Sequence, residues 1–175
     1  MEKKRKKSII ILVMVVILLF IDQVTKIYAI SQWKETTLEV LSNILTFQYA
    51  ENTGGAFGVG QNGTMTFIIA NIVVLGIIIR FIMLQMDRID RKTMVILSLV
   101  LAGGFSNLID RIFRGFVVDF IHLFPNTNFP IFNLADAFIV IGWVSLALMF
   151  AIRTWKEKRS KEVIKKEKND DNKVE

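Results

Sequence analysis

Four stretches of the chain are apolar around their whole circumference and lack the polar face that helices of soluble proteins present to water. They run over residues 8–30, 65–84, 93–112 and 133–153. Each is close to the roughly 20 residues that a helix needs to cross a bilayer. This pattern predicts a mainly α, polytopic membrane protein with four transmembrane helices.

A polar segment, residues 31–64, separates the first two of these helices. Its first half, "TTLEVLSNILTFQYA", is rich in β-branched and aromatic side chains, which favours strands. Its second half, "ENTGGAFGVGQNG", is a glycine- and asparagine-rich loop. Such glycines let backbone come close to a ligand, and Asn52 could hydrogen-bond a peptide there; the alternative is a plain turn.

Lysine and arginine are concentrated in three places, with five in the first eight residues, four in residues 80–92 and nine from residue 153 onward. The two remaining connections hold only Lys34, and Arg111 with Arg114. The positive-inside rule therefore predicts cytoplasmic termini and a cytoplasmic middle connection, with the other two connections outside. We expect one membrane domain over residues 1–155 and a disordered basic cytoplasmic tail over residues 156–175.

The net charge of +6 is thus explained by topology near an anionic lipid surface, and no nucleic-acid partner is expected. The chain has no cysteine and a single histidine, His122. Disulfides, thiolate metal sites, a cysteine nucleophile and a histidine metal cluster are therefore excluded, and no metal or cofactor is expected. His122 lacks an obvious partner and is interpreted as an interfacial loop residue, not a proton shuttle.

Ionisable residues inside membrane helices are costly and therefore informative. Asp22 and Lys26 lie four apart on one face of the first helix, where they form either a neutralising ion pair or part of a substrate site. The third helix carries a second polar group, made up of Gly103, Gly104, Asn107, Asp110 and Arg111. This group is equally consistent with a close helix–helix contact and with a functional site.

Two further acids stand among apolar residues, Asp119 in "GFVVDFI" and Asp136 in "FPIFNLADAFI". Asp136 has a structural interpretation, because Asn133 and Asp136 form a capping-box-like pattern after Pro130. However, the two acids are both expected at the outer ends of neighbouring helices. Two carboxylates in one dry site share a proton near neutral pH, which is the arrangement of an aspartic protease.

Five blocks occur in the order and spacing of a known family: "DQVTK", "ENTGGAFG", "GGFSNLIDR", "GFVVDFI" and "FPIFNLADAFI". Over about residues 8–153 the chain resembles the bacterial lipoprotein signal peptidases, or signal peptidases II. The resemblance implies an aspartic endopeptidase that removes the signal peptide from diacylglyceryl-modified prolipoproteins, just before the lipidated cysteine. It places the catalytic dyad of the family on Asp119 and Asp136.

The resemblance also implies a small extracytoplasmic β-cradle near Thr36–Tyr49 and a mobile loop near Thr53–Asn62. Substrate-binding or positioning roles fall on Asn52, Gly54, Asn107, Arg111 and Asn133. Structural or supporting roles fall on Asp22, Lys26, Gly104 and Asp110. Where the family usually reads Gly-Ala-Ala, this chain has Gly54-Gly55-Ala56, and the extra glycine gives the loop more conformational freedom.

The leading hypothesis is therefore an intramembrane aspartic endopeptidase of the bacterial cytoplasmic membrane, acting as a monomer near the outer leaflet. Its expected partners are lipid-modified prolipoproteins and membrane lipids, and the resemblance implies inhibition by peptide-like antibiotics of the globomycin type. The alternative is a small proton or ion translocator that uses Asp22, Asp110, Asp119 and Asp136 as a relay. A third hypothesis is a helical scaffold in which the polar residues only hold helices together.

Overall fold

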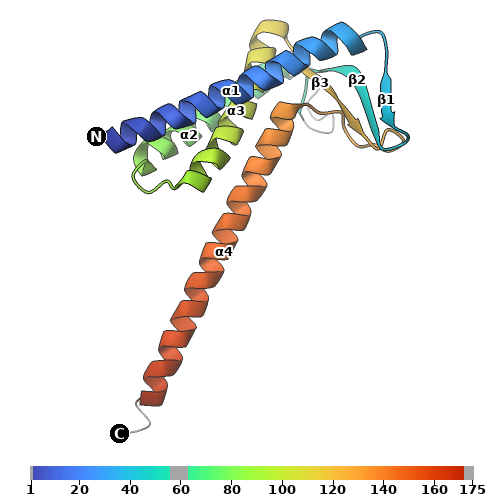
Figure 1. Cartoon of the computed structure of the whole chain (residues 1–175). Coiled ribbons are helices and arrows are strands. Elements are labelled where there is room, and N and C mark those ends of the chain that lie inside the picture. Colours follow the sequence, from blue (N-terminus) through green and yellow to red (C-terminus); the bar gives the residue numbers. More distant parts are fainter. Residues whose placement is uncertain (1, 56–62, 172–175) are drawn as a thin grey trace.

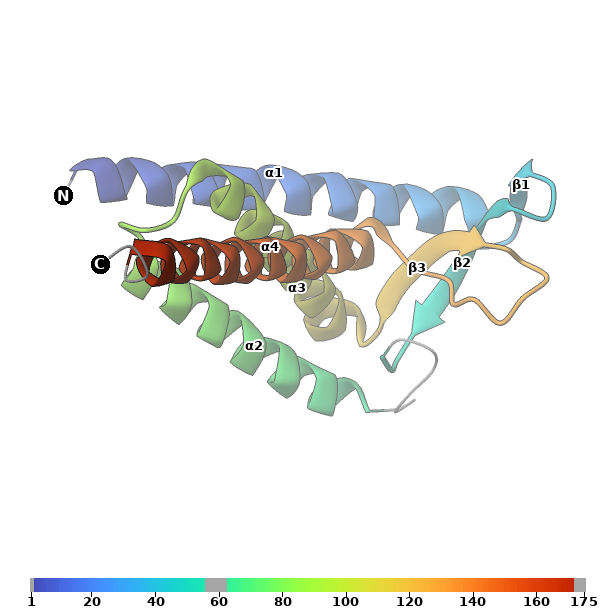
Figure 2. The same cartoon turned by 90° about the horizontal axis from the view of Figure 1, so that it is seen from below.

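The computed structural model describes residues 2–55 and 63–171, with residues 163–171 described by their backbone alone. In chain order the elements are α1 (Glu2–Trp33), β1 (Leu38–Leu41), β2 (Leu45–Asn52), α2 (Thr64–Gln85), α3 (Arg91–Arg114), β3 (Val117–Leu123) and α4 (Leu134–Asp171). Within these residues, four helices are long and apolar enough to cross a membrane. The predicted fold class is confirmed: four helices and one small antiparallel sheet, which lies at one end of the bundle (Figures 1 and 2).

Helix α3 is the centre of the bundle and packs against each of the other three helices. Two-thirds of its apolar stretch (67%) is buried, against 11–17% in the other three helices. Apolar side chains of α1, α2 and α4 point outward instead, among them Leu12, Phe20 and Ile77. An exposed apolar surface of this extent suits helices whose outer faces meet lipid.

The ends of α3 follow from local chemistry. Asp90 is the N-cap, and its carboxylate accepts the backbone N–H of Thr93 at 2.8 Å. Gly115 ends the helix in the left-handed conformation, with φ at 83°, and its N–H donates to the Arg111 carbonyl. Only Phe116 separates Gly115 from the first residue of β3, Val117, so the chain passes from α3 into β3 with a very short connection.

Glycines set the spacing between α3 and its neighbours. A Cβ on Gly103 would overlap the Ala135 carbonyl oxygen at the start of α4, and a Cβ on Gly104 would press on Leu75 of α2. Gly142 of α4 is equally close to the Val100 side chain of α3. The first turn of α4 is therefore drawn tightly onto α3, as small residues allow in membrane helix packing.

The sheet has the order β1-β2-β3 with antiparallel neighbours. Ala50 in β2 lies opposite Asp119 in β3. Trp33, at the end of α1, stacks on Phe47 with 4.7 Å between ring centroids and also lies 5.9 Å from the Phe120 ring. This aromatic contact fixes the sheet against the end of α1.

Three features differ from expectation. Asp119, expected at the outer end of the third helix, lies in strand β3, which the sequence did not predict; the β-branched and aromatic run of residues 116–121 pairs with β2. Helix α4 continues to Asp171, through the tail expected to be disordered, and projects beyond the bundle (Figure 1). That tail is rich in Lys and Glu, including Glu157 and Lys161 four apart, which favours helix. The loop expected over Thr53–Asn62 lies outside the described residues from residue 56 onward.

Candidate active site

Two short segments bring Asp119 and Asp136 together. Asp119 lies in β3 and is 2% exposed, and Asp136 lies in the first turn of α4. The chain between them folds back on itself: Ile121 and Phe132 exchange backbone hydrogen bonds of 2.8 and 3.0 Å. This bridge sets the start of α4 beside β3, so residues far apart along the connection meet at one place.

Asn133 joins the two carboxylates. Its Nδ2 donates to Asp119 Oδ1 at 2.6 Å, and its Oδ1 accepts the Asp136 backbone N–H at 2.9 Å. In return, the Asn133 N–H donates to Asp136 Oδ2 at 3.3 Å, which completes a capping box. The helix cap and the link to Asp119 are therefore the same arrangement, and the two interpretations of Asn133 and Asp136 are compatible.

Each carboxylate also receives a second amide. Asn52 at the end of β2 donates from Nδ2 to Asp119 Oδ2 at 2.9 Å. Asn107 of α3 donates from Nδ2 to Asp136 Oδ1 at 2.7 Å. Three asparagines, at the end of β2, within α3 and just before α4, thus hold the two acids, and each carboxylate keeps a defined orientation.

The environment of Asp119 alters its acidity. Burial, and then the charge of Asp136, raise the pKa of Asp119 to about 7, although the hydrogen bonds from Asn52 and Asn133 act in the opposite direction. A carboxyl group with this pKa exchanges its proton near neutral pH. Such a group suits general acid–base chemistry.

Arg111 borders the pair and is half-buried in α3. Its guanidinium donates to the Gly54 carbonyl at 2.8 Å and lies 5.4 Å from the centre of the Phe67 ring. The buried Nε of Arg111 has no hydrogen-bond partner among the described residues. A buried donor of this kind is available to an acceptor on a bound molecule. Asn52, whose Oδ1 accepts the Gly54 N–H at 3.0 Å, ties the same loop to the site.

A fully buried ion cluster lies behind the pair. Lys26 of α1 contacts Asp22 at 2.8 Å and Asp110 at 3.0 Å, and all three side chains are 0% exposed. Arg114 pairs with the other oxygen of Asp110. Lys26 also donates to Asn107 Oδ1 at 2.9 Å. Asn107 therefore connects the ion cluster to Asp136.

The carboxylates of the cluster hold the backbone next to each site acid. Asp22 Oδ1 accepts the N–H of Ala135 at 2.7 Å, one residue before Asp136. Asp110 Oδ2 accepts the N–H of Val118 at 3.1 Å, one residue before Asp119. These bonds satisfy donors that have no partner within the first turn of α4 and at the start of β3. The ion pair, one of the two interpretations of Asp22 and Lys26, is present and is part of a larger supporting structure.

Three members of this cluster were not singled out in the sequence. Gln23 donates to Asp110 Oδ1 at 2.9 Å and to Ser106 Oγ at 2.8 Å, while Ser106 donates to Asp22 Oδ2 at 2.6 Å. Arg114 contacts Asp110 and Gln23. A signal was available, because Ser106, Asp110 and Arg114 are spaced four apart on one face of α3. His122 also differs from expectation, since it lies in β3 with Gln48 as its partner at 2.8 Å.

Two apolar hollows flank the site on either side of α4. One has a volume of about 370 Å³ and the other of about 220 Å³. The larger is lined by Phe129, Pro130, Phe132, Asp136, Ala137, Val140 and Ile141. The smaller is lined by Phe67, Ala70, Asn71, Val74, Asn107, Arg111 and Ile139. Each therefore combines an apolar wall with polar residues of the site.

Comparison with known proteins gives a consistent result. Residues 14–152 match the family model described as signal peptidase (SPase) II. Among similar curated proteins, the lipoprotein signal peptidase of Thermodesulfovibrio yellowstonii is 41% identical over 128 residues, which cover 72% of this chain and 84% of that protein. The lipoprotein signal peptidase of Anoxybacillus flavithermus is 40% identical over 147 residues, covering 82% and 83% of the two chains.

Solved structures agree with the sequence matches. A bacterial membrane enzyme solved by the in meso method at 2.3 Å resolution superposes with a TM-score of 0.73 at 30% identity, covering 82% of this chain and 88% of that one. A second structure of the same description, at 1.9 Å, superposes with a TM-score of 0.68 at 30% identity, covering 80% and 91%.

Proposed function

Since the chain belongs to the signal peptidase II family and is a multi-pass bacterial membrane peptidase, we propose that Asp119 and Asp136 are its catalytic dyad. The observation that carries this proposal is the pairing of the two acids through Asn133. No serine, cysteine or lysine nucleophile is required. The peptide bond is hydrolysed by water that the dyad activates.

In the proposed reaction one carboxylate takes a proton from water, and the water oxygen bonds to the scissile carbonyl carbon. The other carboxyl group, which carries a proton, donates a hydrogen bond to the carbonyl oxygen. The tetrahedral intermediate then breaks its carbon–nitrogen bond, and the leaving nitrogen takes a proton from the dyad. No covalent adduct with the enzyme forms.

Residues around the dyad would hold the substrate. The unsatisfied Nε of Arg111 and the amide of Asn52 are donors suited to peptide carbonyls. Gly54 contributes a backbone segment without a side chain, which lets an extended peptide approach. Asn107 and Asn133 keep the carboxylates oriented while the substrate binds.

The proposed substrate is a prolipoprotein whose cysteine carries diacylglycerol, cut just before that cysteine. The apolar hollows beside Asp136 and Arg111 support this proposal, since they offer acyl chains and an apolar signal peptide a surface next to polar site residues. Peptide-like inhibitors of the globomycin type would compete for the same surface. One chain holds every residue of the proposed site, which favours action as a monomer.

The distribution of Lys and Arg supports an orientation with cytoplasmic termini. In this orientation the sheet and the dyad lie near the outer leaflet, where a lipid-anchored substrate presents its cleavage site. The competing relay hypothesis needs acids spread through the depth of the bilayer. Here Asp22 and Asp110 are instead neutralised by Lys26 and Arg114.

The test of the proposed function uses the purified full chain and a prolipoprotein prepared with and without diacylglycerol. We expect cleavage of the lipidated form, seen as a gel shift, and a new N-terminus at the lipidated cysteine by mass spectrometry. A pH-sensitive dye inside liposomes measures proton flux in parallel. Flux without cleavage would favour the translocator and overturn the peptidase.

The raised pKa of Asp119 predicts the alkaline side of the pH profile. Below pH 7 this carboxyl is protonated and above it is ionised, so the singly protonated dyad is lost as the pH rises through about 7. We expect kcat/KM to fall about tenfold per pH unit above that value. A profile that stays flat well above the pKa would contradict a proton on Asp119.

A variant at Asn52 tests whether the pKa of Asp119 sets the alkaline limb of the pH profile. Its hydrogen bond to Asp119 lowers the pKa, so Asn52→Ala should raise the pKa and move the alkaline limb to higher pH. A role of Asn52 only in substrate binding would raise KM and leave the limb in place. The exposed Asn126→Ala serves as the control.

A further inference from the structure

We propose that the chain binds an anionic phospholipid in a hollow between α1 and α3, with the lipid phosphate among Lys3, Lys6 and Arg91. The hollow has a volume of about 740 Å³ and lies between the first turns of α1, the α2–α3 connection and the start of α3. It is at the opposite end of the bundle from the sheet that carries Asp119 (Figures 1 and 2). This site is separate from the proposed catalytic function and does not depend on it.

The charge of the hollow is strongly one-sided. Of the described residues that line it, four are cations, namely Lys3, Lys6, Lys7 and Arg91, and one is a carboxylate, Asp90. That carboxylate already caps α3 through Thr93 and lies 3.4 Å from the Arg153 guanidinium. The carboxylate of Asp90 is therefore already paired within the protein, whereas most of the cations that line the hollow remain available to an anion.

Lys7 is also held by hydrogen bonds within the protein, and these bonds help to form the walls of the hollow. Its Nζ donates to the carbonyls of Met86 at 3.0 Å and Ile89 at 2.5 Å. Lys4 adds an ion pair with Asp87 at 2.7 Å. Together these contacts hold the start of α1 onto the α2–α3 connection, so the walls of the hollow are fixed before any ligand arrives.

Three cations remain for a ligand. Lys3 and Arg91 form no ion pair within the described residues, and Lys6 pairs only with Glu2, a contact that is 70% exposed on both sides. An exposed ion pair of this kind contributes little to stability, so Lys6 can readily exchange Glu2 for an anion that binds it more strongly. A phosphate brings several strong acceptor oxygens, which suit both the Arg91 fork and the two lysines.

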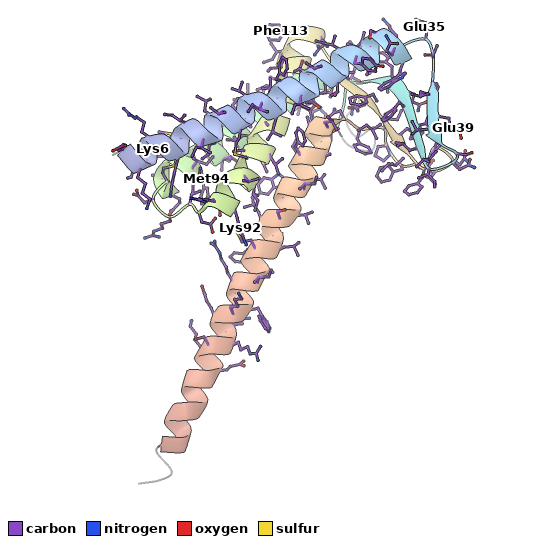
Figure 3. All side chains as sticks on the ribbon, viewed as in Figure 1. Lys6, Glu35, Glu39, Lys92, Met94 and Phe113 are labelled. Carbon is purple, nitrogen blue, oxygen red and sulfur yellow. The ribbon has the colours of Figure 1, made fainter. Side chains whose placement is uncertain are left out.

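The same two helices change from basic to apolar along the hollow. On α1 the lining continues from Lys3 and Lys6 to Ile10 and Met14, and on α3 it continues from Arg91 to Met94 and Val95. Lys6 and Met94 are labelled together at this end of the bundle in Figure 3. Because both apolar spans begin here, the cations lie at the membrane surface and the apolar wall extends into the bilayer. An amphiphile with an anionic headgroup matches this order, whereas a soluble phosphate uses only the basic part.

The experiment measures phosphatidylglycerol binding to the delipidated full chain in a non-ionic detergent by native mass spectrometry. The test variant is Lys3→Gln/Lys6→Gln/Arg91→Gln. The control, Arg5→Gln/Arg88→Gln/Lys92→Gln, removes the same charge from three exposed neighbours that do not line the hollow. We expect affinity to fall roughly 100-fold in the test variant, at about fivefold per cation, and to change little in the control.

Further binding measurements identify the chemical class of the ligand. Phosphatidylcholine should bind weakly, and free glycerol phosphate should not displace phosphatidylglycerol at matched concentration. Val95→Gln, which keeps every charge, should weaken lipid binding because it adds a polar group to the apolar wall. Displacement by glycerol phosphate would overturn the lipid assignment, and equal loss in the test and control variants would overturn the site. Thermal unfolding and prolipoprotein cleavage should be unchanged in the test variant, since its three positions are exposed and distant from the dyad.

Discussion

Asp119→Asn and Asp136→Asn should each lower kcat for prolipoprotein cleavage by at least about 10⁴-fold. Each change keeps the size of the side chain and removes either the group that accepts a proton from water or the group that donates one to the carbonyl. Neither asparagine can replace these steps, because an amide does not titrate in the accessible pH range. Single-turnover cleavage of lipidated prolipoprotein, followed by gel shift, measures the loss.

Measurements of folding distinguish a loss of the catalytic step from a loss of folded protein. In Asp119→Asn the new amide faces two donors, Asn52 and Asn133, so one hydrogen bond is lost at a cost of about 1–3 kcal/mol. The variant should still insert and unfold cooperatively. Asp87→Asn is the matched control, because Asp87 is an exposed aspartate whose one ion pair among the described residues is with Lys4, and its activity should stay within about twofold. Turnover by either dyad variant within about 100-fold of the parent chain would overturn the assignment.

Lys26→Met should destabilise the fold more than the dyad variant Asp119→Asn. Methionine fits the space of the lysine stem but, among the described residues, leaves Asp22 with no cation and Asp110 with only Arg114. Breaking a buried ion pair on one side costs about 3–5 kcal/mol. At this chain length such a loss lowers Tm by roughly 10 °C. Thermal unfolding in detergent, read by near-ultraviolet circular dichroism, measures it.

A double variant tests the cause of that loss. Lys26→Met/Asp22→Asn removes the unpaired charge as well, so it should be more stable than Lys26→Met alone. The exposed Lys92→Met should leave Tm nearly unchanged. If the double variant is less stable than the single one, the cost arises from lost packing and not from an uncompensated carboxylate.

Much of the fold follows from the sequence because a membrane helix has a simple pattern. The helix predicted over residues 65–84 is observed as α2, Thr64–Gln85, and the helix predicted over residues 93–112 is observed as α3, Arg91–Arg114. Strand β3 was missed since "GFVVDFI" has no partner nearby in sequence; its partner, β2, lies more than 60 positions earlier. Pairing at that distance depends on the fold and leaves no local periodicity.

Contacts of the site between residues spaced along one helix could be predicted from the sequence. Contacts between residues of different helices or strands could not. The link between Asp22 and Lys26 follows from their spacing of four. The bond from Asp22 to the Ala135 N–H does not, because it joins α1 to α4. Likewise, the sequence presents Asn133 either as a helix cap or as a partner of the dyad, and only the return of the chain at Phe132 lets it act as both.

The central position of α3 has a consequence for how the protein is made. The apolar stretch of α3 is the least hydrophobic of the four, with a mean hydropathy of 1.6 against 2.1–2.7, and α3 carries Asp110, Arg111 and Arg114 near one end. A segment of this kind leaves the translocon less readily on its own, and α1, already synthesised, supplies Lys26 to neutralise Asp110. α4 emerges after these elements and carries Asp136, with Asn133 directly before its first residue. A chain synthesised only through β3 therefore holds the α1–α3 support and Asp119 but lacks Asp136, so the proposed dyad is complete only after α4 has entered the membrane.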